Sequence, residues 1–209
     1  MTDTVDPLIP LSLLEAVRMV DLPDIDLEAE FVAELRSKRV GLSATVSAQI
    51  KRFTASVRRK QPQSFDEAQG IARLIGRRPD AEAVFREAGR NMARQAYRTI
   101  SPFTRKMMLA LPALLARPIA LRHVRRTAAR CMAGSVRRVG STILFTVPKS
   151  VTLDMAPRQG GCAYYESGLR ELMQLLVGGV GAVEHVHCAG RGEDRCAWRA
   201  EWRPIGTAR

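Results

Sequence analysis

The sequence has few aromatic residues, no long apolar run and no internal repeat. Phe, Trp and Tyr make up 5% of the 209 residues, whereas hydrophobic residues as a whole make up 46%. Leu, Val, Ala and Met must therefore fill most of the core, and a hydrophobic content this high argues against a disordered chain. A chain of this length can form one sizeable domain, or one domain with an extension.

No segment of the sequence suits a membrane-spanning helix. The longest apolar stretch covers 107–116 and is interrupted by Pro112, whereas a spanning helix needs about 20 apolar residues. The first residues include Asp3 and Asp6 instead of a basic region before an apolar run, so we expect no targeting segment. We therefore expect a cytoplasmic protein, for which peripheral contact with a membrane stays open.

Acidic residues are nearly absent from the middle of the chain. Segment 86–138 contains thirteen Lys or Arg residues and one acid, Glu87, whereas residues 1–34 contain nine acids and one Arg. The formal net charge of +12 thus originates in the central segment. Such a segment can bind an anionic ligand, a membrane surface or nucleic acid, or it can pack against the acidic N-terminal arm of the same chain.

Nucleic-acid binding is the least favoured of these alternatives. The basic segment has no helix-turn-helix signature, and its aromatic residues are only Tyr97 and Phe103, which is too few for a stacking platform. Charge alone would have to support that function, so we do not expect a nucleic acid as the partner.

Hydrophobic periodicity predicts helices in the first two-thirds of the chain and mixed elements after it. Ser64 and Glu67 have the capping-box spacing at the start of one helix. The predicted helices cover 9–19, 27–39, 43–59, 64–76, 81–98, 102–116, 118–132 and 164–176, with a turn at 21–24. The predicted strands cover 142–147, 151–155, 182–188 and 196–202, the last two joined as a hairpin. This order predicts an α+β fold in which an antiparallel sheet is packed with helices.

Three of the four cysteines lie in the last quarter of the chain. Cys162 precedes a predicted helix, Cys188 ends one strand of the predicted hairpin and Cys196 begins the other. The hairpin brings Cys188 and Cys196 together, and Cys162 reaches them if the helix folds back onto the sheet. Zn²⁺ accepts tetrahedral sets of sulfur and nitrogen ligands, so the pattern predicts a structural zinc site.

The fourth ligand stays open at this point between His185, His187 and Glu184. Strand alternation places both histidines on one face and Cys188 on the other, unless a bulge intervenes. Four protein ligands would leave no open coordination position, which indicates a structural role. The alternative is that the cysteines are buried free thiols that pack as small apolar residues, as we expect of Cys131.

The stretches 161–169, 184–188 and 192–196 resemble the 4-vinyl reductase domain. That family has a Cys before a helix, a strand ending in Cys, a Gly-Asp-like turn and a Cys opening the last strand, and all three cysteines match in order and spacing. Members such as the sensor domains of phenol-responsive activators hold zinc with these cysteines and a Glu three residues before the second. The resemblance implies zinc bound by Cys162, Cys188, Cys196 and, in place of that Glu, His185.

A looser resemblance covers about residues 64–202. Segments 87–90, 109–112 and 122–134 are similar to the stand-alone bacteriochlorophyll 4-vinyl reductases of phototrophic bacteria. This resemblance implies a fold like that of haem-NO-binding domains, an apolar pocket between helices and sheet, and a homodimer. We accordingly divide the chain into a helical N-terminal extension, 1–63, and a ligand-binding domain, 64–209, with its zinc subsite at 162–196.

The resemblance implies an accessory role in bacteriochlorophyll biosynthesis, for photosynthesis, through binding of a hydrophobic or tetrapyrrole-like molecule. Arginines can pair with the carboxylates of such a ligand, although an apolar stripe is more often plain core and an Arg face is more often simply solvated. The candidate ligand-binding residues are Arg90, Arg94, Phe103, Met107, Leu111, Arg122, His123, Arg126 and Tyr165.

Two other functions compete with ligand binding. One is a 4-vinyl reductase enzyme that acts on a chlorophyllide-type substrate, which needs a hydride or electron source. The sequence has no GxGxxG fingerprint and no four-cysteine cluster beyond the zinc set, so we assign no catalytic residue. The other is a ligand-sensing regulatory protein.

Overall fold

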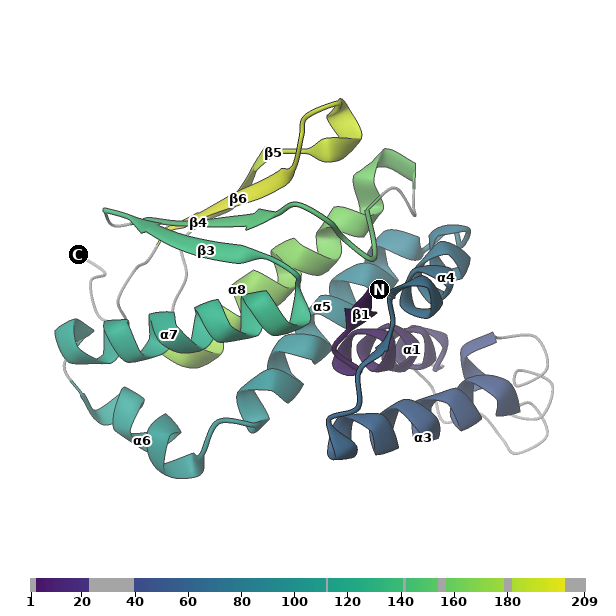
Figure 1. The fold of residues 1–209 in the computed structure, drawn as a ribbon, viewed down its shortest axis with the longest axis horizontal. Coiled ribbons are helices and arrows are strands. Elements are labelled where there is room, and N and C mark those ends of the chain that lie inside the picture. The colour runs from purple at the N-terminus through teal and green to yellow at the C-terminus, as the bar shows by residue number, and fades with distance from the viewer. Residues whose placement is uncertain are drawn as a thin grey trace.

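The computed structural model describes residues 3–22, 40–111, 113–140, 142–153, 157–178 and 182–201. Within them, helices pack on a four-stranded antiparallel sheet, and a second sheet pairs β1 (Thr4–Val5) with β2 (Gln63–Ser64) (Figure 1). The predicted α+β class is therefore confirmed. No helix in these residues combines the length and apolar character that crossing a membrane requires.

Two of the first helices, α3 (Ala44–Arg59) and α4 (Phe65–Gly76), begin at serine caps. The elements before and after them are α1 (Leu8–Asp21), the short turn η1 (Val40–Leu42) and α5 (Ala81–Arg98). Ser43 Oγ accepts the Val46 N–H at 3.2 Å and Ser64 Oγ accepts the Glu67 N–H at 3.4 Å, which satisfies otherwise unpaired helix donors. The predicted helices at 9–19, 43–59, 64–76 and 81–98 are confirmed. The helix over 27–39 and the end of the turn at 21–24 lie outside the described residues.

The break between the next two helices differs from the prediction. Helix α6 (Pro102–Ala110) ends before Pro112, and α7 (Ala113–Cys131) contains Pro118 in its interior, so the predicted helices over 102–116 and 118–132 have the wrong boundary. Leu111 has an extended backbone (φ −77°, ψ 146°) because the residue before a proline is sterically kept out of the helical region. Pro118 removes one N–H donor from α7 without ending it.

The large sheet has the strand order β3 (Ser135–Val139), β4 (Thr142–Val147), β6 (Cys196–Glu201), β5 (Val183–His187). The predicted hairpin of β5 and β6 is confirmed. The predicted strand at 151–155 is wrong over 151–153, where Ser150 Oγ accepts the backbone N–H groups of Thr152 and Leu153 at 3.0 Å and forms a bend. The partner of β4 is instead the edge strand β3, whose residues are mostly exposed and carry no buried alternation.

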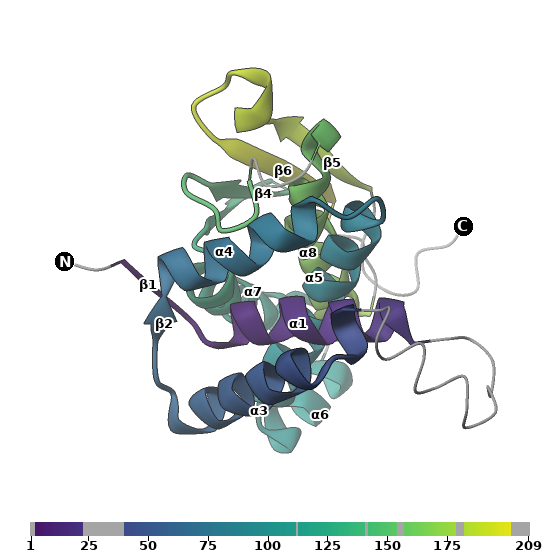
Figure 2. The same cartoon turned by 90° about the vertical axis from the view of Figure 1, so that its right-hand side faces the viewer.

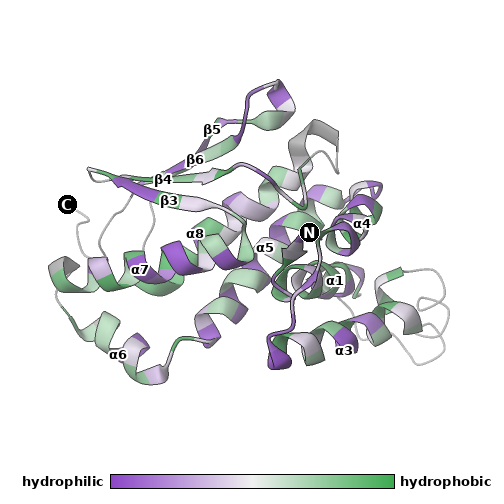
Figure 3. Cartoon of the chain, in the orientation of Figure 1, coloured by the Kyte–Doolittle hydropathy of each residue, from purple (hydrophilic) through white to green (hydrophobic). Residues whose placement is uncertain are grey.

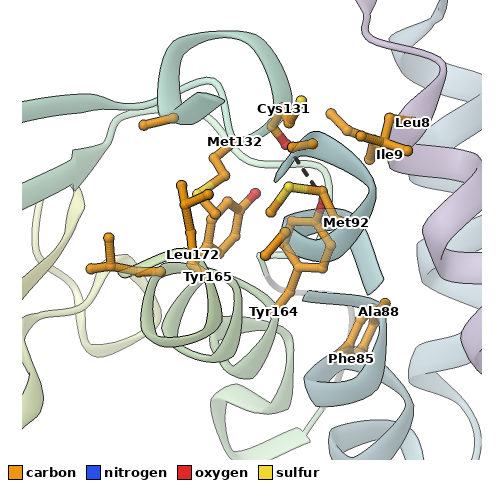
Figure 4. Packing of buried hydrophobic residues seen from close by; sticks show 14 of the residues in the cluster. Leu8, Ile9, Phe85, Ala88, Met92, Cys131, Met132, Tyr164, Tyr165 and Leu172 are labelled. Atoms are coloured by element: carbon orange, nitrogen blue, oxygen red, sulfur yellow. Dashed lines mark hydrogen bonds between the residues drawn. The ribbon is translucent and has the colours of Figure 1, made fainter. Parts of the chain in front are cut away.

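Helix α8 (Ala163–Val177) lies between the sheet and α5 and organises the core. A Cβ on Gly89 of α5 would lie 2.1 Å from the Tyr164 carbonyl oxygen, so only glycine permits this close helix crossing. Tyr164 is buried among Met92, Met132 and neighbouring side chains, and its hydroxyl donates to the Cys131 carbonyl at 3.4 Å (Figure 4). The sheet and the first helices thus share one core.

The acidic N-terminal arm packs within this core and pairs with basic residues. Helix α1 lies between α5 and α3 (Figure 2), and nine of its first ten residues are buried. Asp6 pairs with Arg130 of α7 at 2.7 Å, and Asp21 pairs with Arg78 at 2.6 Å. Part of the basic excess is therefore neutralised inside the molecule. Division of the chain at residue 63 stays a prediction.

Candidate metal centre

A glycine and a polar turn fix the position of Cys162. This cysteine ends the short helix η2 (Pro157–Cys162) and is the N-cap of α8. Thr152 Oγ1 donates to the Gly161 carbonyl at 2.8 Å, and a Cβ on Gly161 would lie 1.8 Å from the Thr152 carbonyl oxygen. The turn at 150–153 therefore lies directly against the residue that precedes the cysteine, and holds it at the start of α8.

A β-bulge in β5 brings His185 and Cys188 to the same face. His185 is opposite Trp198 of β6, but His187 is opposite Ala197, so Val186 is an extra residue in the pairing. Without a bulge, His185 and Cys188 would point to opposite faces. The extra residue shifts the alternation of side chains by one position. Cys188 therefore lies on the same face as His185, and His187 points to the opposite face.

The loop between β5 and β6 wraps the second and third cysteines. It forms the turn η3 (Ala189–Arg191) and reverses at Gly192, whose φ of 90° favours glycine. The Ala189 N–H donates to Cys196 Sγ at 3.3 Å. The Cys188 N–H donates to the carboxylate of Glu193, which also accepts a bond from His187 Nδ1 at 2.8 Å. One backbone amide thus bonds the sulfur of Cys196, and the Glu193 carboxylate holds the backbone of Cys188.

Four potential ligand atoms meet in one cluster. The sulfur atoms of Cys162, Cys188 and Cys196 and a ring nitrogen of His185 all lie within 4.8 Å of one another, and the three cysteines are buried. The sulfurs of Cys162 and Cys188 are 4.0 Å apart. A tetrahedral ion with Zn–S bonds of 2.3 Å separates two sulfurs by about 3.8 Å, so this spacing fits a metal and is too long for a disulfide.

The imidazole of His185 has the environment of a ligand. Its Nε2 is buried and has no hydrogen-bond partner within the described residues. An unpaired buried polar atom is costly, and a metal bond would remove that cost. The ring stacks on Trp198 with a centroid distance of 4.6 Å and an interplanar angle of 7°, and Trp198 in turn stacks on Phe145. The aromatic row therefore fixes the plane of the imidazole.

The cluster already favours a thiolate. A hydrogen bond with Cys162 lowers the pKa of Cys196 against the opposing effect of burial, and His185 and the Ala189 N–H lower it further. The same hydrogen bond, together with burial, raises the pKa of the Cys162 thiol. The hydrogen bond between the two sulfurs thus favours one thiolate within the cluster. Thiolate sulfur is the form that metals bind.

The other two candidates for the fourth ligand are engaged elsewhere. Glu184 accepts from Arg199 across the hairpin at 2.6 Å, and His187 is exposed and bonded to Glu193. Neither belongs to the cluster. The predicted set of Cys162, Cys188 and Cys196 with His185 is thus the set that the structure brings together.

The candidate ligand-binding residues are not gathered in one place. Arg90 pairs with Glu87 and Arg94 with Glu171, so these two arginines serve contacts within α5 and between α5 and α8. Tyr165 is buried beneath the sheet and its hydroxyl bonds to Ser150.

The remaining candidates lie on α6, α7 and the link between them. Phe103 is 77% exposed, Met107 and Leu111 are half-buried, and Arg122 is exposed. His123 and Arg126 line a surface groove.

Two residues that support the metal centre were not singled out from the sequence. Trp198 orients His185, and Glu193 fixes the Cys188 amide. The only sequence signal for Trp198 is its position two residues after Cys196, which places both on one face of the strand. Glu193 lies in a loop, where no periodicity applies.

Comparison of the chain with protein-family models, with curated proteins and with solved structures finds no significant match.

Proposed function

We propose that this chain is a small-molecule-binding domain whose C-terminal hairpin is held by a structural zinc ion. The observation that carries the proposal is the convergence of three buried sulfurs and one imidazole from three separate segments. Cys162, His185, Cys188 and Cys196 would hold the ion, which supplies a crosslink between the start of α8 and the hairpin and leaves no open position for chemistry.

The donor set supports zinc over calcium and magnesium. Three soft thiolate donors and one imidazole suit Zn²⁺, whereas Ca²⁺ and Mg²⁺ take oxygen ligands. The carboxylates of Glu184 and Glu193, the nearest acidic groups in the strand and loop, are bonded to Arg199 and His187. The supporting bonds from Glu193 and Ala189 are of the kind that orient ligands in metal sites.

The ligand-binding part of the proposal rests on the resemblance to the 4-vinyl reductase domain. The order of sheet, helix and hairpin around the cysteines is the order that this resemblance implies. We infer a hydrophobic or tetrapyrrole-like ligand with carboxylate groups, and an accessory role in bacteriochlorophyll synthesis. The homodimer and the cytoplasmic location belong to the same proposal.

Elemental analysis of the purified protein tests the metal site. We expect about one zinc ion per chain in the wild type, and a loss of most of it in His185→Ala. His187→Ala is the matched control, because this histidine lies two residues away and points out of the cluster. Equal zinc content in the two variants would contradict the ligand assignment, and wild-type protein without zinc would contradict the site.

Titration with protoporphyrin IX, followed by absorbance, tests ligand binding. A saturable spectral change at a ratio of about one pigment per chain is the expected result for a dedicated site. A change that grows without saturation, or none, would contradict tetrapyrrole binding while leaving the zinc result unaffected.

A further inference from the structure

A groove of about 610 Å³ lies on the helical side of the molecule, away from the cysteine cluster. Its walls come from four parts of the chain: the segment 4–7, the end of α3, the end of α5 and the C-terminal half of α7. In Figure 1 this region lies between the lower end of α5, α7 and the end of α3 that leads into β2. The volume falls within the range of about 300–1,000 Å³ that is common for sites of drug-sized ligands.

The walls of the groove carry an excess of positive charge. Lys60, Arg126 and Arg130 line it, and the single acidic residue of the lining is Asp6. Asp6 is already bonded to Arg130 at 2.7 Å and to the Leu8 N–H at 2.9 Å. Within the described residues, no ion pair engages Lys60 or Arg126. Two cations therefore remain available to an anion.

The rest of the lining is apolar or uncharged. Val5, Val57, Ala96 and Ile100 supply hydrocarbon surface beside the charged residues. In Figure 3 the end of α3 is coloured hydrophilic where it leads into β2, while the neighbouring turns include hydrophobic residues. Burial and the adjacent arginines lower the pKa of His123, so at neutral pH its imidazole is a neutral hydrogen-bonding group at the groove wall.

We propose that this groove binds an amphipathic organic carboxylate, with the apolar body against Val57 and Ile100 and the carboxylate between Lys60 and Arg126. A planar guanidinium pairs with a carboxylate through two parallel hydrogen bonds, and Lys60 adds a point charge. The proposal deepens the ligand-binding part of the proposed function and does not depend on the metal site. It assigns only Arg126 and His123, among the candidate residues, to the ligand.

The experiment uses 1-pyrenebutyrate, a fluorescent carboxylate, and 1-pyrenebutanol, which has the same apolar body without the charge. We expect the wild type to bind the carboxylate at least about tenfold more tightly, because a bond to a charged group outweighs a neutral one. Arg126→Glu should abolish this preference. Arg122→Glu is the matched control, since Arg122 is exposed on the same helix but does not line the groove.

The outcomes separate this proposal from the proposed function. Equal affinity for the two probes, or equal losses in the two variants, would overturn the groove assignment. Protoporphyrin IX that binds equally well to both variants would overturn it too, while the proposed function would stand. Zinc content and thermal melting, measured on the same samples, identify any variant that has lost its fold. In that case Arg126→Lys repeats the comparison, because lysine retains the charge but cannot form the two parallel hydrogen bonds of arginine.

Discussion

Thermal stability should depend on free zinc through the cysteine cluster. A metal that binds only the folded state stabilises it by an amount set by the ratio of free metal to its dissociation constant, about 4 kcal/mol at a thousandfold excess. For a domain of roughly 200 residues, each kcal/mol shifts Tm by about 2–4 °C. Buffering free zinc from saturating to negligible levels should therefore lower Tm by about 8–16 °C.

Loss of zinc should destabilise the large sheet through Cys196. Cys196 begins β6, which is hydrogen-bonded to both β4 and β5, so release of this residue affects the centre of the sheet. Substitution of Cys196 by Ala should abolish the zinc dependence and hold Tm near the value of the zinc-free wild type. Circular dichroism melts in zinc buffers provide the measurement.

Cys131 provides the matched control for this prediction. It is also a fully buried cysteine, but it lies at the end of α7 and its thiol does not belong to the cluster. Cys131→Ala should lower Tm at every zinc level by a constant amount, because it loses packing and not a ligand. A wild-type Tm that is independent of free zinc, or a Cys196→Ala protein that retains the full dependence, would refute the reasoning.

Four further substitutions test the fold. Gly89→Ala should destabilise by about 1–3 kcal/mol in chemical denaturation, because its Cβ would meet α8, whereas Gly70→Ala, in open space on α4, should stabilise by about 0.5–1 kcal/mol; equal effects would contradict the close crossing. Asp21→Ala should cost about 1–3 kcal/mol by the same measurement, because it leaves the buried Gly41 N–H without its acceptor while Arg78 keeps its pair with Asp80; an unchanged free energy of unfolding would contradict this role of Asp21. Burial raises the pKa of Glu15 in the folded state above its value in the unfolded state. As pH rises from the unfolded-state pKa to the folded-state pKa, the unfolded state loses this proton first, so the free energy of unfolding falls. Glu15→Gln should remove that fall, and thermal melts from acid to neutral pH provide the measurement. The difference in stability between the variant and the wild type should vanish at low pH, where Glu15 is protonated in both states.

Local patterns in the sequence were sufficient for most of the helices. Apolar spacing and the caps Ser43 and Ser64 identify α3 and α4 to within a residue, because both signals act within one turn of the helix. The break at Pro112 was misplaced to Pro118 because each proline permits a helix boundary locally. In the structure α7 continues through Pro118, whose side chain is exposed.

The three cysteines could be assigned from the spacing of the residues, whereas spacing left the fourth ligand open and only the family resemblance implied His185. Their order around a helix and a hairpin is local information, whereas the choice between His185 and His187 depends on how β5 pairs with β6. A shift of one residue in the pairing register moves every side chain of a strand to the opposite face of the sheet, and the partner strand sets that register. The bulge at Val186 is therefore invisible to periodicity in β5 alone.

The bulge also connects the metal centre to the core. One row of paired residues crosses all four strands and consists of Val136, Phe145, Trp198 and His185. Trp198 lies in the middle of this row and is fully buried. Because Val186 is one extra residue in the pairing, His185 stays opposite Trp198 and Cys188 lies on the same face of the sheet as His185. The geometry of the cysteine–histidine cluster and the packing of the sheet are thus set by one register. The groove on α7 shares no residue with this row, so the two proposed sites should respond independently to substitution.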